Sequence, residues 1–74
     1  MTLAEVTRGQ IVRIQAIDSP DVRSQALRLG LGVGQTATCQ TVIPRGPIVL
    51  AKARQEIAIG RQLAQAIHVE LVQP

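Results

Sequence analysis

The chain has few side chains that could carry out a reaction or hold a metal ion. His68 is its one histidine and Cys39 its one cysteine, and the two fall on different predicted strands. Nucleophilic catalysis needs a base beside the nucleophile, and a tight zinc or ferrous site needs three or four His, Cys, Asp or Glu ligands. Asp18 and Asp21 fit the start of a helix better than acid–base work. We therefore predict a non-enzyme with no catalytic, cofactor-binding or metal-binding residues.

The two lone residues each allow a structural and a chemical interpretation. His68 is expected on the outer face of the last strand, with no acid placed to orient its ring; the alternative is a ligand role. Cys39 is expected to be a small buried hydrophobe, and the alternative is a reactive thiol. A small chain without a disulfide indicates a reducing compartment, which favours the cytosol.

Three glycines, Gly30, Gly32 and Gly34, raise the possibility of a phosphate-binding loop. A dinucleotide fingerprint requires G-x-G-x-x-G between a strand and a following helix. Here the third glycine falls one position early, and the predicted order is helix, loop, strand. The pattern instead predicts a helix that ends at Gly30, followed by a tight turn into a strand.

The amino-acid composition excludes functions that depend on aromatic side chains. The 74 residues form one domain, 1–74, with no Phe, Tyr or Trp, so base stacking and aromatic cages are excluded. The net charge of +3 comes mostly from scattered arginines, which form either a solvated surface or a surface for carboxylate or phosphate partners. No signal peptide and no run of about 18 apolar residues is evident. We expect a cytoplasmic protein without membrane insertion.

Alternating apolar residues predict five strands, at 10–17, 35–43, 48–51, 55–59 and 67–72. Ser19, Pro20 and two aspartates predict a helix over 20–29, and short helical turns are expected near 3–6 and 61–66. Many short strands joined by tight turns indicate a mainly β fold, a small closed barrel with one helix after the first strand.

The same alternation assigns faces to the strands. In the first strand it places Val12, Ile14 and Ala16 inward and leaves Ile11 and Ile17 on a partly covered outer face. In the second strand it groups Ala37, Cys39, Thr41 and Ile43. The predicted core consists of Val12, Ile14, Leu29, Cys39, Ile57, Ile59, Ile67 and Val69.

Several motifs together resemble the FeoA family. The helix and loop match its R-x-x-x-L-x-x-L/G-L-x-x-G pattern at Arg23, Leu27, Gly30, Leu31 and Gly34. Further matches lie in the lead-in, in the Pro44–Pro47 turn, in Ile57-Ala58-Ile59 and in the last strand. The chain departs from the family in placing Arg61 one position late and in having no glycine in the turn at 52–55, where a longer or looser hairpin is expected. The resemblance implies a five-stranded SH3-like barrel.

The resemblance also implies an accessory role in ferrous iron transport. In that role the protein would bind the cytosolic GTPase region of the transporter FeoB, and this partner would hold it at the inner membrane. Candidate partner-binding residues are Arg23, Leu27, Arg28, Leu31 and Arg61. Leu27 lies off the apolar stripe of its helix and is either an exposed anchor or packed on a wider barrel face. The alternatives are a basic nucleic-acid-binding barrel and a ligand- or metal-sensing domain; nucleic acid is not expected, and a homo-oligomer is compatible with the sequence.

Overall fold

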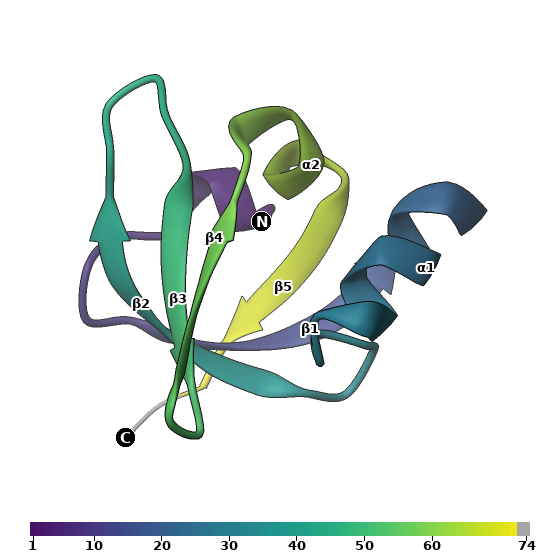
Figure 1. Ribbon diagram of the computed structural model, residues 1–74, viewed down its shortest axis with the longest axis horizontal. Helices are drawn as coiled ribbons and strands as arrows, with labels where there is room; N and C mark the ends of the chain where they lie inside the picture. Colours follow the sequence, from purple (N-terminus) through teal and green to yellow (C-terminus); the bar gives the residue numbers. More distant parts are fainter. Residues whose placement is uncertain (73–74) are drawn as a thin grey trace.

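The computed structural model describes residues 1–72, which are built around one antiparallel sheet (Figure 1). Its strands follow the order β4-β3-β2-β1-β5. They span, in chain order, β1 (Ile11–Ile17), β2 (Thr36–Val42), β3 (Ile48–Lys52), β4 (Gln55–Ile59) and β5 (Ile67–Leu71). A 3₁₀ turn, η1 (Leu3–Glu5), comes first, α1 (Pro20–Arg28) follows β1, and α2 (Arg61–Gln65) joins β4 to β5. The predicted mainly β class with one helix after the first strand is confirmed.

The start of α1 follows from its sequence. The Ser19 hydroxyl accepts a hydrogen bond from the Val22 amide at 3.1 Å, and Pro20 occupies the first helical turn, where its missing N–H is not needed. The helix is short and only Ala26 in it is fully buried. Isolated helices of this length are marginal in water, so α1 depends on its contact with the barrel.

The core is aliphatic, as the absence of aromatic residues requires. Seven of the eight predicted core residues are buried, since Val12, Ile14, Cys39, Ile57, Ile59, Ile67 and Val69 are each at most 7% exposed. Leu29 was predicted to join them and is instead 38% exposed. Leu31, which was not in the predicted core, is completely buried.

Two β-bulges change which side chains face inward. Gln15 is an extra residue in β1 opposite β5, and Gln40 is an extra residue in β2 opposite β3. Each bulge leaves two successive residues exposed and shifts the alternation by one position. The predicted inward faces are therefore wrong beyond each bulge: Ala16, Thr41 and Ile43 are exposed, while Ile17 is buried and Val42 packs against the core.

The two end strands of the sheet differ in how their free edges are covered. Residues preceding η1 lie along β5, where Thr2 bridges His68 and the Val69 amide donates to the Met1 carbonyl at 2.9 Å. Within residues 1–72 no pairing joins β4 to β5. A closed barrel was expected, but hydrogen bonds do not join its strands all the way round. At one end α2 spans the gap between β4 and β5 (Figure 1).

Candidate protein-interaction surface

The C-terminal end of α1 and the loop after it carry three exposed apolar residues. Leu27 is 69% exposed, Val33 58% and Leu29 38%; we call these three residues the helix-end surface. In Figure 1 α1 lies at the side of the barrel, and its C-terminal end leads into the loop that returns to β2. Of the two interpretations of Leu27, exposure is the correct one. Three large apolar side chains exposed at the end of one short helix make this end of α1 the candidate interaction surface.

The chain leaves α1 through a Schellman motif. The Gly30 amide donates to the Leu27 carbonyl at 3.1 Å, and the Leu31 amide donates to the Ala26 carbonyl at 2.8 Å. Gly30 has φ +78°, which an L-residue with a side chain adopts only at a cost. The predicted helix end at Gly30 is confirmed.

The same motif explains why Leu31 does not belong to the surface. In a Schellman motif the residue after the glycine packs against the last turn of the helix. Leu31 and Ala26 occupy these two positions, and both are completely buried. Leu31 was predicted as a partner contact; with no exposed area it is a core residue in this structure.

Gly32 gives Leu27 the room that it occupies. A Cβ atom built on Gly32 would lie 3.2 Å from Leu27 Cδ1, closer than ordinary van der Waals contact. Leu27 therefore lies against the backbone of the loop while most of its side chain faces outward. The absence of a side chain at Gly32 therefore leaves the space in which the Leu27 side chain lies.

Two arginines flank Leu27, and they differ in how free they are. Arg23 donates from Nη2 to the Ile17 carbonyl at 3.3 Å, which ties it to the end of β1. Arg28 makes no hydrogen bond or ion pair with another side chain in residues 1–72, and it lines a groove beside β4. The helix-end surface thus has a cationic rim, of which Arg28 is the free member.

Arg61 has an internal role in the structure. Its Nη1 donates to the Ala4 carbonyl at 3.2 Å and its Nη2 to the Ile43 carbonyl at 2.8 Å. These bonds join α2 to η1 and to the β2–β3 hairpin. Arg61 as a partner contact stays a prediction, but its guanidinium is already engaged by two carbonyls.

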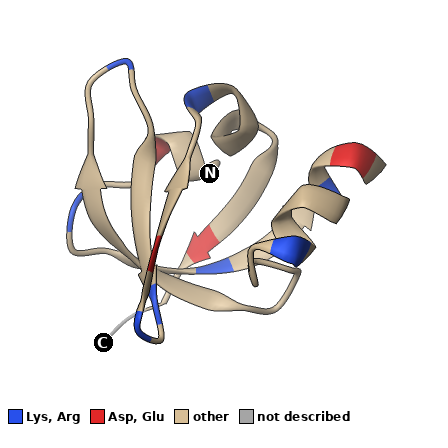
Figure 2. Cartoon of the chain, viewed as in Figure 1, with Lys and Arg blue, Asp and Glu red and all other residues tan. Residues whose placement is uncertain are grey.

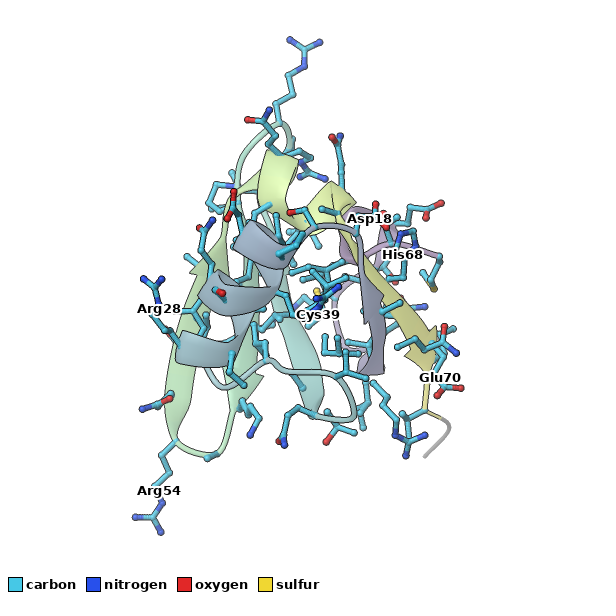
Figure 3. The ribbon with its side chains drawn as sticks, turned by 90° about the vertical axis from the view of Figure 1, so that its right-hand side faces the viewer. Asp18, Arg28, Cys39, Arg54, His68 and Glu70 are labelled. Carbon is cyan, nitrogen blue, oxygen red and sulfur yellow. The ribbon has the colours of Figure 1, made fainter. Side chains whose placement is uncertain are left out.

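One pair of polar residues was missed by the sequence analysis. His68 Nε2 lies 2.7 Å from Asp18 Oδ1, and Figure 3 shows the two side chains together at one side of the molecule. An acid therefore does orient His68, contrary to expectation. The two residues are 50 positions apart and nothing local in the sequence connects them; only the β1–β5 pairing brings them together.

Two further titratable groups, the Cys39 thiol and the Glu5 carboxyl, have shifted pKa values that are explained by burial and by helix capping. Cys39 is 1% exposed, and this burial raises the pKa of its thiol. A raised pKa disfavours the reactive thiolate, so Cys39 is better described as a buried apolar residue. A hydrogen bond from the Thr2 amide lowers the pKa of Glu5. Among residues 1–72 there is no group of three or more His, Cys, Asp or Glu side chains placed to hold a metal ion.

The same residues contain no helix that is long and apolar enough to cross a membrane.

Solved structures of FeoA proteins have the same fold as this chain. The chain is similar to the crystal structure of an iron uptake regulatory protein, FeoA, with 26% identity over 97% of both chains and a TM-score of 0.89. It is similar to the solution structure of a FeoA protein from Chlorobium tepidum, with 25% identity over 99% of this chain and 71% of that one and a TM-score of 0.85. These likenesses confirm the predicted SH3-like barrel.

It also resembles ScaR, solved with bound Cd²⁺, at 28% identity and a TM-score of 0.81, where the match covers 95% of this chain but 35% of ScaR. No curated protein sequence matches the chain. A family model, that of the FeoA domain, matches residues 1–71. This match spans nearly all of the sequence and both bulged strands, α1 and its glycine loop. The chain therefore belongs to the FeoA family, which is associated with ferrous iron transport.

Proposed function

We propose that this protein is a non-enzymatic interaction module that binds the cytosolic GTPase region of the ferrous iron transporter FeoB and so assists ferrous iron uptake. The observation that carries the proposal is the helix-end surface, whose three apolar residues are exposed around the end of α1 beside the free cation of Arg28. Apolar residues ringed by charge are the usual composition of a protein-binding anchor. A small rigid barrel without a reactive centre among its described residues suits a binding role.

No observation favours the nucleic-acid alternative. Figure 2 shows the Lys and Arg residues spread over separate loops and both ends of the molecule instead of along one face. Backbone recognition of nucleic acid uses clustered cations and loses affinity steeply with salt.

The test is a kinetic binding measurement with the purified cytosolic GTPase region of FeoB from the same organism. Leu27→Ala is expected to weaken binding about five- to thirtyfold, mainly through faster dissociation, because it truncates the most exposed apolar side chain of the surface. Leu71→Ala is the matched control, since Leu71 is 40% exposed on β5, away from α1. A Leu27→Ala protein that melts normally and binds with unchanged affinity contradicts the proposal.

Charge reversal gives an independent arm of the same experiment. Arg23→Glu with Arg28→Glu should slow association and flatten its salt dependence, because rim charges act mainly on encounter. Arg8→Glu with Arg45→Glu changes the net charge equally at two distant loops and serves as the control. If the α1 double variant keeps a normal melting curve and undiminished binding, α1 is scaffold and the surface near Arg61 becomes the next candidate.

A further inference from the structure

The open edge of β4 presents unpaired backbone groups. β3 and β4 are joined by a two-residue turn, with Lys52 opposite Gln55, and the pair that flanks such a turn is hydrogen-bonded in both directions. Hydrogen-bonded and non-hydrogen-bonded pairs then alternate. Glu56 and Ala58 fall in the non-hydrogen-bonded pairs, so their N–H and C=O groups point away from β3, toward the open edge.

Nothing in residues 1–72 accepts or donates at this edge. The backbone hydrogen bonds outside the helices and ladders include neither Glu56 nor Ala58. The opposite end of the sheet is different, because the residues before η1 lie along β5. An uncovered edge strand is a template for pairing with another chain, and β4 is the strand that offers it.

A groove runs along this edge. It has a volume of about 560 Å³ and is lined by Arg28 and Leu29 of the α1 end on one side and by Gln55–Ala58 of β4 on the other. Leu29 is 38% exposed and forms an apolar part of the wall. The residue that was expected in the core therefore faces the groove, next to the unpaired edge.

The net charge around the groove is positive, because two arginines face one acid. Arg28 lines it without an ion-pair partner in residues 1–72, and Arg54 lies at the β3–β4 turn, at the end of the same edge. Figure 3 shows both arginines projecting on one side of the molecule. The one acid in the lining, Glu56, is turned across the outer face of the sheet, where Gln40 Nε2 donates to its Oε2 at 2.5 Å.

We propose that this groove binds an extended acidic peptide segment, which adds to β4 as a sixth, hydrogen-bonded strand. Alternate side chains of the segment would be apolar and face Leu29, and acidic side chains would reach Arg28 and Arg54. A strand rises about 3.3 Å per residue, so five or six residues of the segment would cover β4. Main-chain bonds would supply affinity and the alternating side chains specificity, as in other strand additions.

A second copy of this chain is the less suitable occupant. Pairing β4 with β4 about a twofold axis would bring the arginines of two positively charged molecules toward one groove, and like charges oppose such contact. The inference goes beyond the proposed function, because it names a backbone edge and a class of ligand. The two share Arg28 and Leu29, but Leu27 belongs to the proposed function alone and the β4 edge to this inference alone.

The experiment is amide hydrogen exchange of the full chain by NMR, with and without a blocked eight-residue peptide of alternating Glu and Val. In the free protein the Glu56 and Ala58 amides should exchange fast and the Ile57 amide slowly. Saturating peptide should slow exchange at Glu56 and Ala58 by about tenfold or more and leave Ile57 nearly unchanged. The same peptide with Lys in place of Glu is the control and should have no effect.

Two variants test the same inference by affinity. Ala58→Pro removes an outward N–H without breaking a bond to β3, and an edge strand tolerates proline at such a position. This variant should bind the peptide about tenfold more weakly. Ala58→Ser keeps the N–H and should bind the peptide normally. Arg28→Glu should weaken binding about fivefold, and Arg8→Glu should not. Arg28→Glu and the exchange pattern carry the test should the proline variant fail to fold.

Three outcomes would overturn the inference. One is peptide binding without protection at Glu56 and Ala58, another is equal binding of the Lys peptide. The third is protection of these amides in the free protein that rises with protein concentration, which would assign the edge to a second copy. Unchanged FeoB binding by a normally folded Leu27→Ala protein contradicts the proposed function alone, so the two failures can be told apart.

Discussion

At the scale of single residues, two leucines four positions apart take opposite roles. Leu27 is 69% exposed and Leu31 is completely buried. The difference arises at Gly30, whose positive φ turns the chain back so that Leu31 packs on Ala26. Leu27 lies before that turn, on the helix face that the barrel leaves uncovered. The exposed leucine is therefore the one available to a partner.

The core offers the clearest prediction for a single residue. Ile59 is 1% exposed on β4, opposite Ile48 of β3. Ile59→Ala should reduce the free energy of unfolding by about 2–5 kcal/mol, because the lost apolar contacts leave a cavity. A domain of this size has little stability to spare, so thermal or urea unfolding should show a large shift.

Val33→Ala is the matched control for that change. Val33 is 58% exposed, and its truncation should alter the free energy of unfolding by no more than about 0.5 kcal/mol. An Ile59→Ala protein that unfolds like the parent would show that the inward face of β4 is assigned wrongly.

At the scale of elements, two tight turns place a positive φ on very different residues. Gly30 ends α1 with φ +78°, and Ala53 begins the β3–β4 turn with φ +54°. Only the first central residue of that hairpin has a positive φ, as in a type II′ turn, where glycine is usual. Without a glycine the hairpin was expected to be longer or looser. It is not longer, because Lys52 still pairs with Gln55 across a two-residue turn.

Gly30→Ala tests the helix end. A Cβ at Gly30 would meet nothing within 4 Å, so the penalty is conformational and not steric. The left-handed conformation costs an L-residue about 1–2 kcal/mol, partly offset by the smaller entropy of the unfolded chain. We expect a net loss of about 1 kcal/mol in the free energy of unfolding, measured by urea titration. An unchanged midpoint would mean that the Schellman motif does not limit stability.

Ala53→Gly tests the other turn and should have the opposite sign. Relief of the positive φ at Ala53 outweighs the added flexibility of the unfolded chain, so the free energy of unfolding should rise by about 0.5–1 kcal/mol. This corresponds to an increase of about 2–8 °C in Tm for a domain of this size. Ala58→Gly, in the adjacent strand, is the control and should lower Tm; stabilisation by both changes would refute the explanation by turn geometry.

At the scale of the whole molecule, Arg61 links parts of the chain that the sheet does not connect. It holds α2 to the Ala4 carbonyl of η1 and to the Ile43 carbonyl of the β2–β3 hairpin. The hairpin extends from one end of the barrel (Figure 1), and this guanidinium ties its base to α2.

Arg61→Ala should therefore lower the free energy of unfolding by about 1–2 kcal/mol, because two carbonyls lose a charged donor. Arg61→Lys should recover little of it, since an ammonium cannot span two acceptors as a guanidinium does. Chemical denaturation of both variants beside Arg45→Ala, at the exposed hairpin tip, provides the comparison. Full recovery by lysine would show that charge, not geometry, makes the link.

Local patterns in the amino-acid sequence were enough to predict the features that depend on neighbouring residues. Alternation located all five strands to within two residues at each end, and Ser19, Pro20 and Gly30 bounded α1. These signals are local, because strand periodicity and helix capping involve residues a few positions apart. The sequence also identified Leu27, Arg23 and Arg28 as neighbours on one element.

Tertiary structure alone decided how those elements face one another. The bulges at Gln15 and Gln40 exist only when β1 and β2 are paired with their partners, and the one at Gln15 exchanges Ala16 for Ile17 in the core. The bond between Asp18 and His68 likewise joins residues 50 positions apart. The open edge of β4 has the same origin: whether a strand is left unpaired depends on where every other segment lies, which no local pattern encodes.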